Sequence, residues 1–216
     1  MIFNEFEENI VKRYINSDLA VERKGIFDKN HIDASEYSEE EKEYCTVCRL
    51  NIMGKENCQK YGKKEGRYVT VFFENLSLIN KKSFEDIAIS IADEIKHILA
   101  FACEKDIRDS SVLVVGLGNS NLSVDAIGPL TLDKLMVTRH IGYEFKKECS
   151  VSAITPGVVS RTGIETVELV SATVEKIKPD VIVAVDALAA GSCERLGTTV
   201  QISDAGITPG SGVGNG

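Results

Sequence analysis

The spacing of hydrophobic and polar positions predicts several strands and helices. Residues 67–73 (Arg-Tyr-Val-Thr-Val-Phe-Phe) are rich in β-branched and aromatic side chains, which predicts a strand. Residues 112–115 and 181–185 are continuous apolar runs, typical of strands buried on both faces of a parallel sheet. After Ser83, apolar residues recur every three or four positions, which predicts a helix with this inward face: Phe84, Ile87, Ile91, Ile95, Ile98 and Leu99.

The second half of the chain alternates between the two kinds of element. A helix is expected from Pro129 through Met136 and another over residues 162–177, with strands at 151–154 and 198–202. The order from residue 112 onward is therefore βαβαββ. This alternation predicts an α/β fold, a three-layer sandwich with a mostly parallel sheet.

The two ends of the chain differ from this core. Residues 1–66 are polar and weakly periodic, with an acidic run over residues 39–43. We interpret residues 19–66 as a polar N-terminal appendage and residues 67–216 as the core. Residues 209–216 form a glycine-rich ending, and we expect the C-terminal part of the core to be missing.

Charge and composition exclude several classes of protein. The chain has 216 residues, a mass of 23.6 kDa and a formal net charge of −8. Lys and Arg do not gather on one helix face, which argues against direct binding to nucleic acid or to an anionic membrane. No apolar run is long enough to span a bilayer, and the acidic N-terminus is no secretory signal. We therefore expect a cytoplasmic protein.

The six cysteines do not form a complete metal site. Cys45-x-x-Cys48 with Cys58 resembles part of a zinc site, but a structural zinc needs four ligands and Cys58 has no second ligand at pair spacing. A redox pair is less favoured, because such a pair would open a helix after a strand. Of the remaining cysteines, Cys103 continues the inward face of the helix predicted after Ser83. Cys149 and Cys193 have no partner His nearby in the sequence.

A glycine-rich turn follows the first buried strand. Gly116-x-Gly118 resembles the start of a dinucleotide-binding fingerprint, but Asn121 stands where the third glycine is required. The next strand is followed by Thr155-Pro156-Gly157, without an acidic residue to hold a ribose. A nucleotide site is therefore disfavoured, and the glycines are explained by a tight turn.

Two aspartates follow the two buried strands. Asp125 lies in the loop after residues 112–115, and Asp186 directly follows residues 181–185. Ligands bind at the carboxyl ends of parallel strands, so the two carboxylates can converge. They could share a proton and activate water, or hold a divalent metal with a third ligand such as His140. The simpler alternatives are a helix N-cap for Asp125 and a helix C-terminal cap for His140.

At these residues the chain resembles the spore germination protease family. The resemblance begins with residues 17–22 and 66–70 and runs in order through nearly the whole chain. Its further motifs are residues 113–119, 125–129, 137–140, 155–158, 162–166, 184–190, 201–207 and 209–215.

The resemblance implies an endopeptidase that degrades small acid-soluble DNA-protecting spore proteins during germination, in the spore or forespore interior. It implies synthesis as a zymogen, a homotetramer, no metal or other cofactor, and aspartic-type catalysis by residues that correspond to Asp125 and Asp186. It also implies a fold related to the hydrogenase maturation proteases. Two alternatives stay open: a metal-dependent maturation endopeptidase, and an inactive binding paralogue.

The N-terminal segment contains a candidate processing site. Asp18-Leu19-Ala20 places an acidic residue before an apolar residue and alanine, which resembles the sequence cut in the family's substrates. We predict that residues 1–18 are a propeptide removed between Asp18 and Leu19. The alternative is that these residues are an ordinary frayed terminus.

Overall fold

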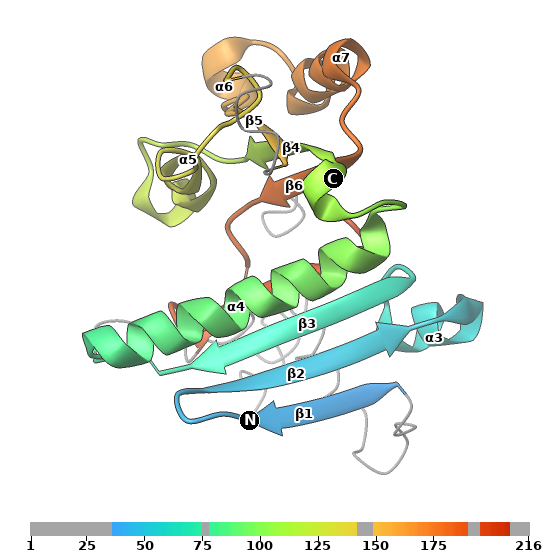
Figure 1. Cartoon of the computed structure of the whole chain (residues 1–216), viewed down its shortest axis with the longest axis vertical. Coiled ribbons are helices and arrows are strands. Elements are labelled where there is room, and N and C mark those ends of the chain that lie inside the picture. The colour runs from blue at the N-terminus through green and yellow to red at the C-terminus, as the bar shows by residue number, and fades with distance from the viewer. Residues whose placement is uncertain (1–35, 75–77, 142–148, 190–194, 208–216) are drawn as a thin grey trace, which may run out of the picture. The chain divides into compact units, whose positions relative to one another are not determined.

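The computed structural model describes residues 36–74, 78–141, 149–189 and 195–207. The chain divides into two compact units, one within residues 1–98 and 188–216 and the other over residues 99–187. Each unit has its own β-sheet (Figure 1). In the described parts of the chain, no helix is both long and apolar enough to cross a membrane.

An antiparallel sheet forms the first unit. Its strands are β1 (Tyr37–Glu41), β2 (Cys45–Ile52), β3 (Gly66–Phe73) and β7 (Thr199–Ser203), in the order β1-β2-β3-β7. All neighbouring strands pair antiparallel. The predicted strand over residues 67–73 is confirmed as β3.

Alternation along β2 gives this sheet two apolar faces. One face contributes Val47 to a cluster with Ile87 and Ile98 of α4 (Lys81–Ala102), and Figure 1 shows α4 lying along the sheet. The other face contributes Leu50, which packs with Tyr61 of α3 (Gly54–Tyr61). Because successive strand residues point to opposite faces, β2 is covered on both sides.

A parallel sheet forms the second unit. Its strands are β4 (Ser111–Gly116), β5 (Ser150–Ile154) and β6 (Val181–Val185), in the order β5-β4-β6. The helices are η2 (Ile107–Asp109), η3 (Ser123–Asp125), α5 (Ile127–Leu132), α6 (Val159–Thr162) and α7 (Thr166–Ile177).

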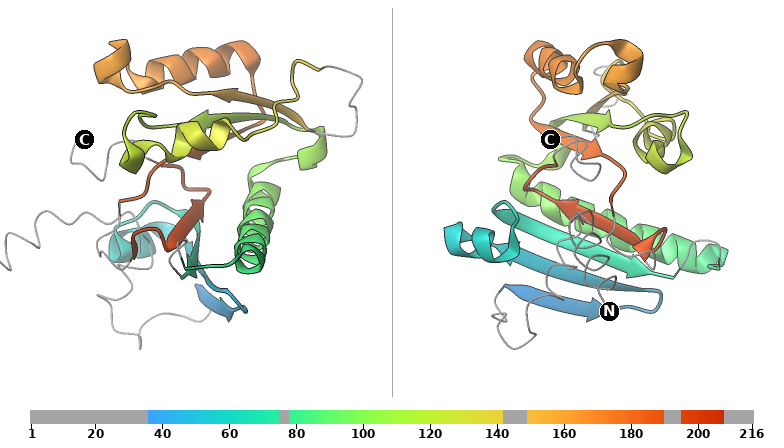
Figure 2. Two further views of the ribbon diagram at one scale, coloured as in Figure 1. Left: turned by 90° about the vertical axis from the view of Figure 1, so that its left-hand side faces the viewer. Right: turned by 180° about the vertical axis from the view of Figure 1, so that it is seen from behind.

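Helices cover both faces of the parallel sheet. Leu113 and Val115 of β4 form a cluster with Val170 and Val174 of α7. On the opposite face, a Cβ at Gly116 would stand 3.0 Å from Leu132 Cδ1, at the end of α5. Figure 2 shows α6 and α7 on one side of these strands and α5 on the other. The predicted three layers and parallel pairing are confirmed within this unit.

Strand pairing elsewhere corrects the prediction of one mostly parallel sheet. The strand expected at residues 198–202 is β7, which pairs antiparallel with β3 and not with the parallel strands. The expected polar appendage contains β1, β2 and α3, and most residues of β2 are buried in the core of the first unit. These pairings depend on how side chains pack between strands that are distant in sequence. The local spacing of apolar residues could therefore not predict them.

Two predicted helices are shorter than expected. The helix expected from Pro129 through Met136 is α5, which ends at Leu132. The helix expected over residues 162–177 is α7, which begins only at Thr166, and the separate short helix α6 ends at Thr162. Gly163 ends α6 in a left-handed conformation with φ of 69°. A capping box between Glu165 and Glu168 then starts α7.

The inward face of α4 also differs from the prediction. The buried residues are Ser83, Ile87, Ser90, Glu94 and Ile98. Two of the apolar residues expected inside are exposed instead, Phe84 at 55% and Ile95 at 36%. A buried glutamate thus takes a position on the face turned to the sheet.

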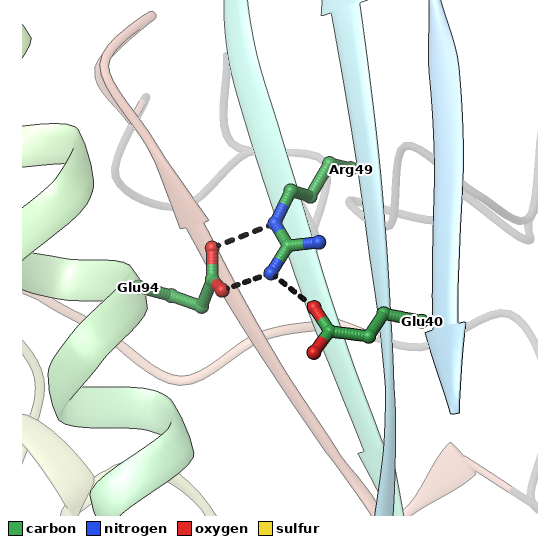
Figure 3. A network of polar contacts seen from close by, with 3 residues as sticks. All are labelled: Glu40, Arg49 and Glu94. Atoms are coloured by element: carbon green, nitrogen blue, oxygen red, sulfur yellow. Dashed lines mark hydrogen bonds and ion pairs between the residues drawn. The ribbon is translucent and has the colours of Figure 1, made fainter. Parts of the chain in front are cut away.

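Arg49 of β2 explains why Glu94 is buried (Figure 3). Its guanidinium donates to both carboxylate oxygens of Glu94, with an Nε to Oε2 distance of 3.1 Å. Its Nη2 also donates to Glu40 of β1 at 2.8 Å. The hydrogen bond to Glu94 is the main cause that raises the pKa of Arg49 above its ordinary value. The three residues therefore join two strands and a helix of the first unit.

Candidate functional site

The candidate site lies at the carboxyl edge of the parallel sheet, in the second unit. Gly116 at the end of β4 is paired with Val185 at the end of β6. One residue further, the Leu117 N–H donates to the Val185 carbonyl at 2.9 Å. Asp186 directly follows β6 and is half-buried. The two strands therefore end side by side, as expected from the sequence. The predicted burial on both faces holds for β4 but is wrong for β6, where Ile182 is 45% exposed.

Asp125 is folded back onto the turn that leaves β4. The Asn119 N–H donates to the Asp125 carbonyl at 3.0 Å. Gly118 has φ of 107°, and a Cβ there would stand 2.1 Å from the Asp125 carbonyl oxygen and 2.9 Å from its Oδ1. Glycine is therefore required at position 118, because any side chain would overlap Asp125.

Gly128 holds the start of α5 against the two strand ends. A Cβ at this position would stand 2.2 Å from the Leu117 carbonyl oxygen and 2.6 Å from that of Val185. The helix thus touches the ends of both β4 and β6. Asp125 and Asp186, which flank these contacts in sequence, lie at the same edge of one sheet.

Neither simple capping alternative holds. The N-cap of α5 is Ala126, without a side-chain hydrogen bond, so Asp125 does not cap this helix. The helix ends at Leu132, well before His140, so His140 is not its C-terminal cap. Asp186 Oδ1 accepts a hydrogen bond from the Ala187 N–H at 2.8 Å, which orients one oxygen of its carboxylate.

A pocket of about 300 Å³ lies between the loops that follow β4 and β5, and its wall includes Gly118, which contacts Asp125. Its lining consists of Gly118, Asn119, Ser120, Thr155, Pro156, Gly157, Val158, Arg161 and Thr162. The chain leaves β4 toward α5 on one face and leaves β5 toward α6 and α7 on the other. Such a point of divergence is where open α/β sheets place their ligands.

Sequence reasoning missed Arg161, which is the one charged residue among the described residues that line the pocket. A signal was present, since Arg161 is also the one charged residue in the stretch from Cys149 to Ile164. It follows the Pro156-Gly157 turn by a few residues, beyond the end of a strand of the parallel sheet.

Possible metal ligands do not gather in the described part of the chain. His140 is exposed, and among the residues with described positions no three His, Cys, Asp or Glu side chains lie close enough to hold an ion. The structure thus does not bring His140, Asp125 and Asp186 together as one ligand set.

The cysteine spacing has a structural explanation. Cys45 and Cys48 are both buried in β2, three positions apart, so their side chains point to opposite faces of the sheet. Cys45 belongs to the cluster under α4, while Cys48 accepts a hydrogen bond from the Tyr37 hydroxyl at 3.3 Å. These two thiols cannot form one metal or redox site. Cys58 lies on α3 and packs against the other cluster.

Three residues singled out in the sequence lie outside the described residues: Asp18, Leu19 and Cys193. Their predicted roles therefore rest on the sequence alone. Cys103 and Cys149 are half-buried.

The family described as germination protease matches residues 15–216. The chain is 39% identical over 206 residues to the germination protease of Caldanaerobacter subterraneus subsp. tengcongensis, an alignment that covers 93% of this chain. It is 46% identical over 167 residues, or 74% of its length, to that of a Geobacillus species, and 38% identical over 221 residues, or 97%, to that of Bacillus subtilis.

This chain belongs to the germination protease family. The aligned part covers 62%, 44% and 59% of the lengths of these three relatives, so the chain spans about six-tenths or less of each.

Proposed function

We propose that this chain forms the catalytic core of an aspartic-type endopeptidase, with Asp125 and Asp186 as its catalytic pair. One observation carries the proposal: both aspartates lie at the carboxyl edge of adjacent parallel strands, in a chain of the germination protease family. The close contact between Gly118 and the Asp125 backbone supports it, because this contact fixes the loop that carries the carboxylate.

The proposed chemistry needs two carboxyl groups in different protonation states. One carboxylate accepts a proton from water as the water oxygen attacks the scissile carbonyl carbon. The other carboxyl group is protonated and donates a hydrogen bond to the carbonyl oxygen, on which negative charge develops. Two neighbouring carboxylates favour this sharing of one proton, since like charges at short range do not ionise together.

The substrates that we propose are the small acid-soluble DNA-protecting proteins of spores, as the family resemblance implies. The same resemblance supports a zymogen, a homotetramer and a place in the spore interior. Exposed apolar side chains on α4, among them Phe84 and Ile89, would suit contact with another subunit. The turn from Gly116 to Asn119 and the following Asp125 support a fold related to the hydrogenase maturation proteases.

The test uses the full-length protein that contains this chain and a purified small acid-soluble spore protein. We expect cleavage into discrete fragments that mass spectrometry identifies, unchanged in saturating EDTA. Activity that is lost in EDTA and restored by zinc would instead establish a metal-dependent endopeptidase. Binding of the spore protein without any cleavage would establish the binding paralogue and contradict the proposal.

A further inference from the structure

The pocket between the loops that follow β4 and β5 has the chemistry of an anion site. Arg161 is the one charged residue of its described lining, and within the described residues its guanidinium forms no ion pair. The other lining residues are small or uncharged, so no carboxylate of the lining competes for this guanidinium. A positive charge that no lining carboxylate neutralises favours a negatively charged ligand in a concave site.

Gly118 connects this pocket to the proposed catalytic pair. Gly118 forms part of the pocket wall, and the position of its missing Cβ lies 2.9 Å from Asp125 Oδ1. A substrate side chain in the pocket would therefore lie against a residue that itself contacts Asp125. The pocket volume, about 300 Å³, is at the lower end of the range for ligand pockets and suits a single side chain.

The geometry points to a specificity pocket in which Arg161 binds a carboxylate side chain of the polypeptide substrate, next to the bond that is cut. This inference rests on the proposed function and names the residue that selects the substrate. A guanidinium is suited to the task, because its planar array of N–H donors matches the two oxygens of a carboxylate. Arg161 would thus be a binding residue and take no part in proton transfer.

The test compares two peptides that differ only in charge. The acidic peptide has the sequence of residues 14–22 of this chain, with Asp18 before the predicted cleavage bond, and the neutral peptide carries Asp18→Asn. The full-length protein is assayed as the wild type, as Arg161→Gln, and as the matched control Arg139→Gln. Arg139 is an exposed arginine of the same unit that does not line the pocket.

We expect the wild type to cleave the acidic peptide with a kcat/KM about tenfold or more above that of the neutral peptide. Arg161→Gln should remove this preference by slowing cleavage of the acidic peptide alone, whereas Arg139→Gln should retain it. An unchanged preference in Arg161→Gln would overturn the inference, although the proposed function would stand.

A binding assay keeps the two proposals separate. Both peptides are titrated into the Asp125→Asn protein, with and without Arg161→Gln, and fluorescence anisotropy gives the dissociation constants. Tighter binding of the acidic peptide that depends on Arg161 would support the pocket even if no variant cleaved either peptide, in which case only the proposed function would fail. Equal binding of the two peptides would contradict the pocket.

Discussion

Gly118 and Asp125 are in contact so close that position 118 has no room for a side chain, since a Cβ there would lie 2.1 Å from the Asp125 carbonyl oxygen. The glycine turn after β4 therefore lets the loop that carries Asp125 fold back against the strand end. This relation links the backbone of the second unit to its proposed chemistry.

The first prediction concerns this contact. Gly118→Ala should lower the free energy of unfolding by about 3 kcal/mol or more, because a strained φ adds to the overlap with Asp125. Gly163→Ala is the matched control, since Gly163 also has a positive φ but has no atom within 4 Å of its Cβ position. It should cost about 1–2 kcal/mol. Urea denaturation gives both values, and equal losses would contradict the account.

The second prediction concerns the buried ion pair of the first unit. Glu94→Gln should destabilise the protein by about 3 kcal/mol, because Arg49 then loses its buried anionic partner under α4 and keeps, among the described residues, the more exposed Glu40. Asp93→Asn, on the same helix, removes the exposed ion pair with Lys96 and should cost less than about 1 kcal/mol. Denaturation midpoints measure the difference, and a Glu94→Gln protein as stable as the Asp93→Asn protein would contradict a structural role for this pair.

The third prediction concerns acid stability of the second unit. Asp180 accepts hydrogen bonds from the backbone N–H and the hydroxyl of Ser111, each at 2.7 Å, and pairs with Lys105. These contacts, led by the backbone N–H, lower the pKa of Asp180 from 3.8 to about 2. A carboxyl group with a lowered pKa in the folded state stabilises the protein above its unfolded pKa and loses this effect as the pH falls.

Stability should therefore decline as the pH falls from about 4 to about 2, and Asp180→Asn should weaken this decline. Thermal unfolding at a series of pH values measures it. The control is Asp133→Asn, an exposed aspartate of the same unit, which should follow the wild-type profile. A wild-type and an Asp180→Asn profile that remain parallel over this range would refute the assignment.

The fourth prediction concerns processing of the N-terminus. We expect cleavage between Asp18 and Leu19 when the full-length protein becomes active, which leaves a chain that begins Leu19-Ala20-Val21. The physical reason is that Asp18-Leu19-Ala20 offers an acidic, then apolar, then small sequence like that of the proposed substrates. N-terminal sequencing of the active form checks this. Full activity from a chain that retains Met1–Asp18 would contradict the prediction that the protein is made as a zymogen.

The parallel strands were predictable because their signal is local. The continuous apolar runs before Gly116 and before Asp186 predict strands, and this placed both aspartates after strand ends, although only β4 is buried on both faces. The contact of Asp125 with Gly118 was not predictable, since it depends on how the loop after β4 folds back.

Most of the features that could not be predicted depend on contacts between residues that lie far apart in the sequence. Glu94 is buried only because Arg49, on another element, binds it, so the helical pattern alone placed Phe84 and Ile95 inside instead. Strand β1 could not be predicted from its acidic sequence for a related reason, since Glu40 of this strand accepts a hydrogen bond from the same arginine. Arg161 lines a pocket only because β4 and β5 pair in the sheet, which brings the loops after these two strands together.

The most direct measurement is the turnover of a peptide substrate by Asp125→Asn and Asp186→Asn in the full-length protein, beside Asp133→Asn as the control. Asn preserves the size of each side chain but cannot accept or share the proton. We expect each of the first two variants to lose activity by at least about a hundredfold with unfolding midpoints near that of the wild type, and Asp133→Asn to retain it. Near-normal turnover by either Asp125→Asn or Asp186→Asn would contradict the catalytic pair.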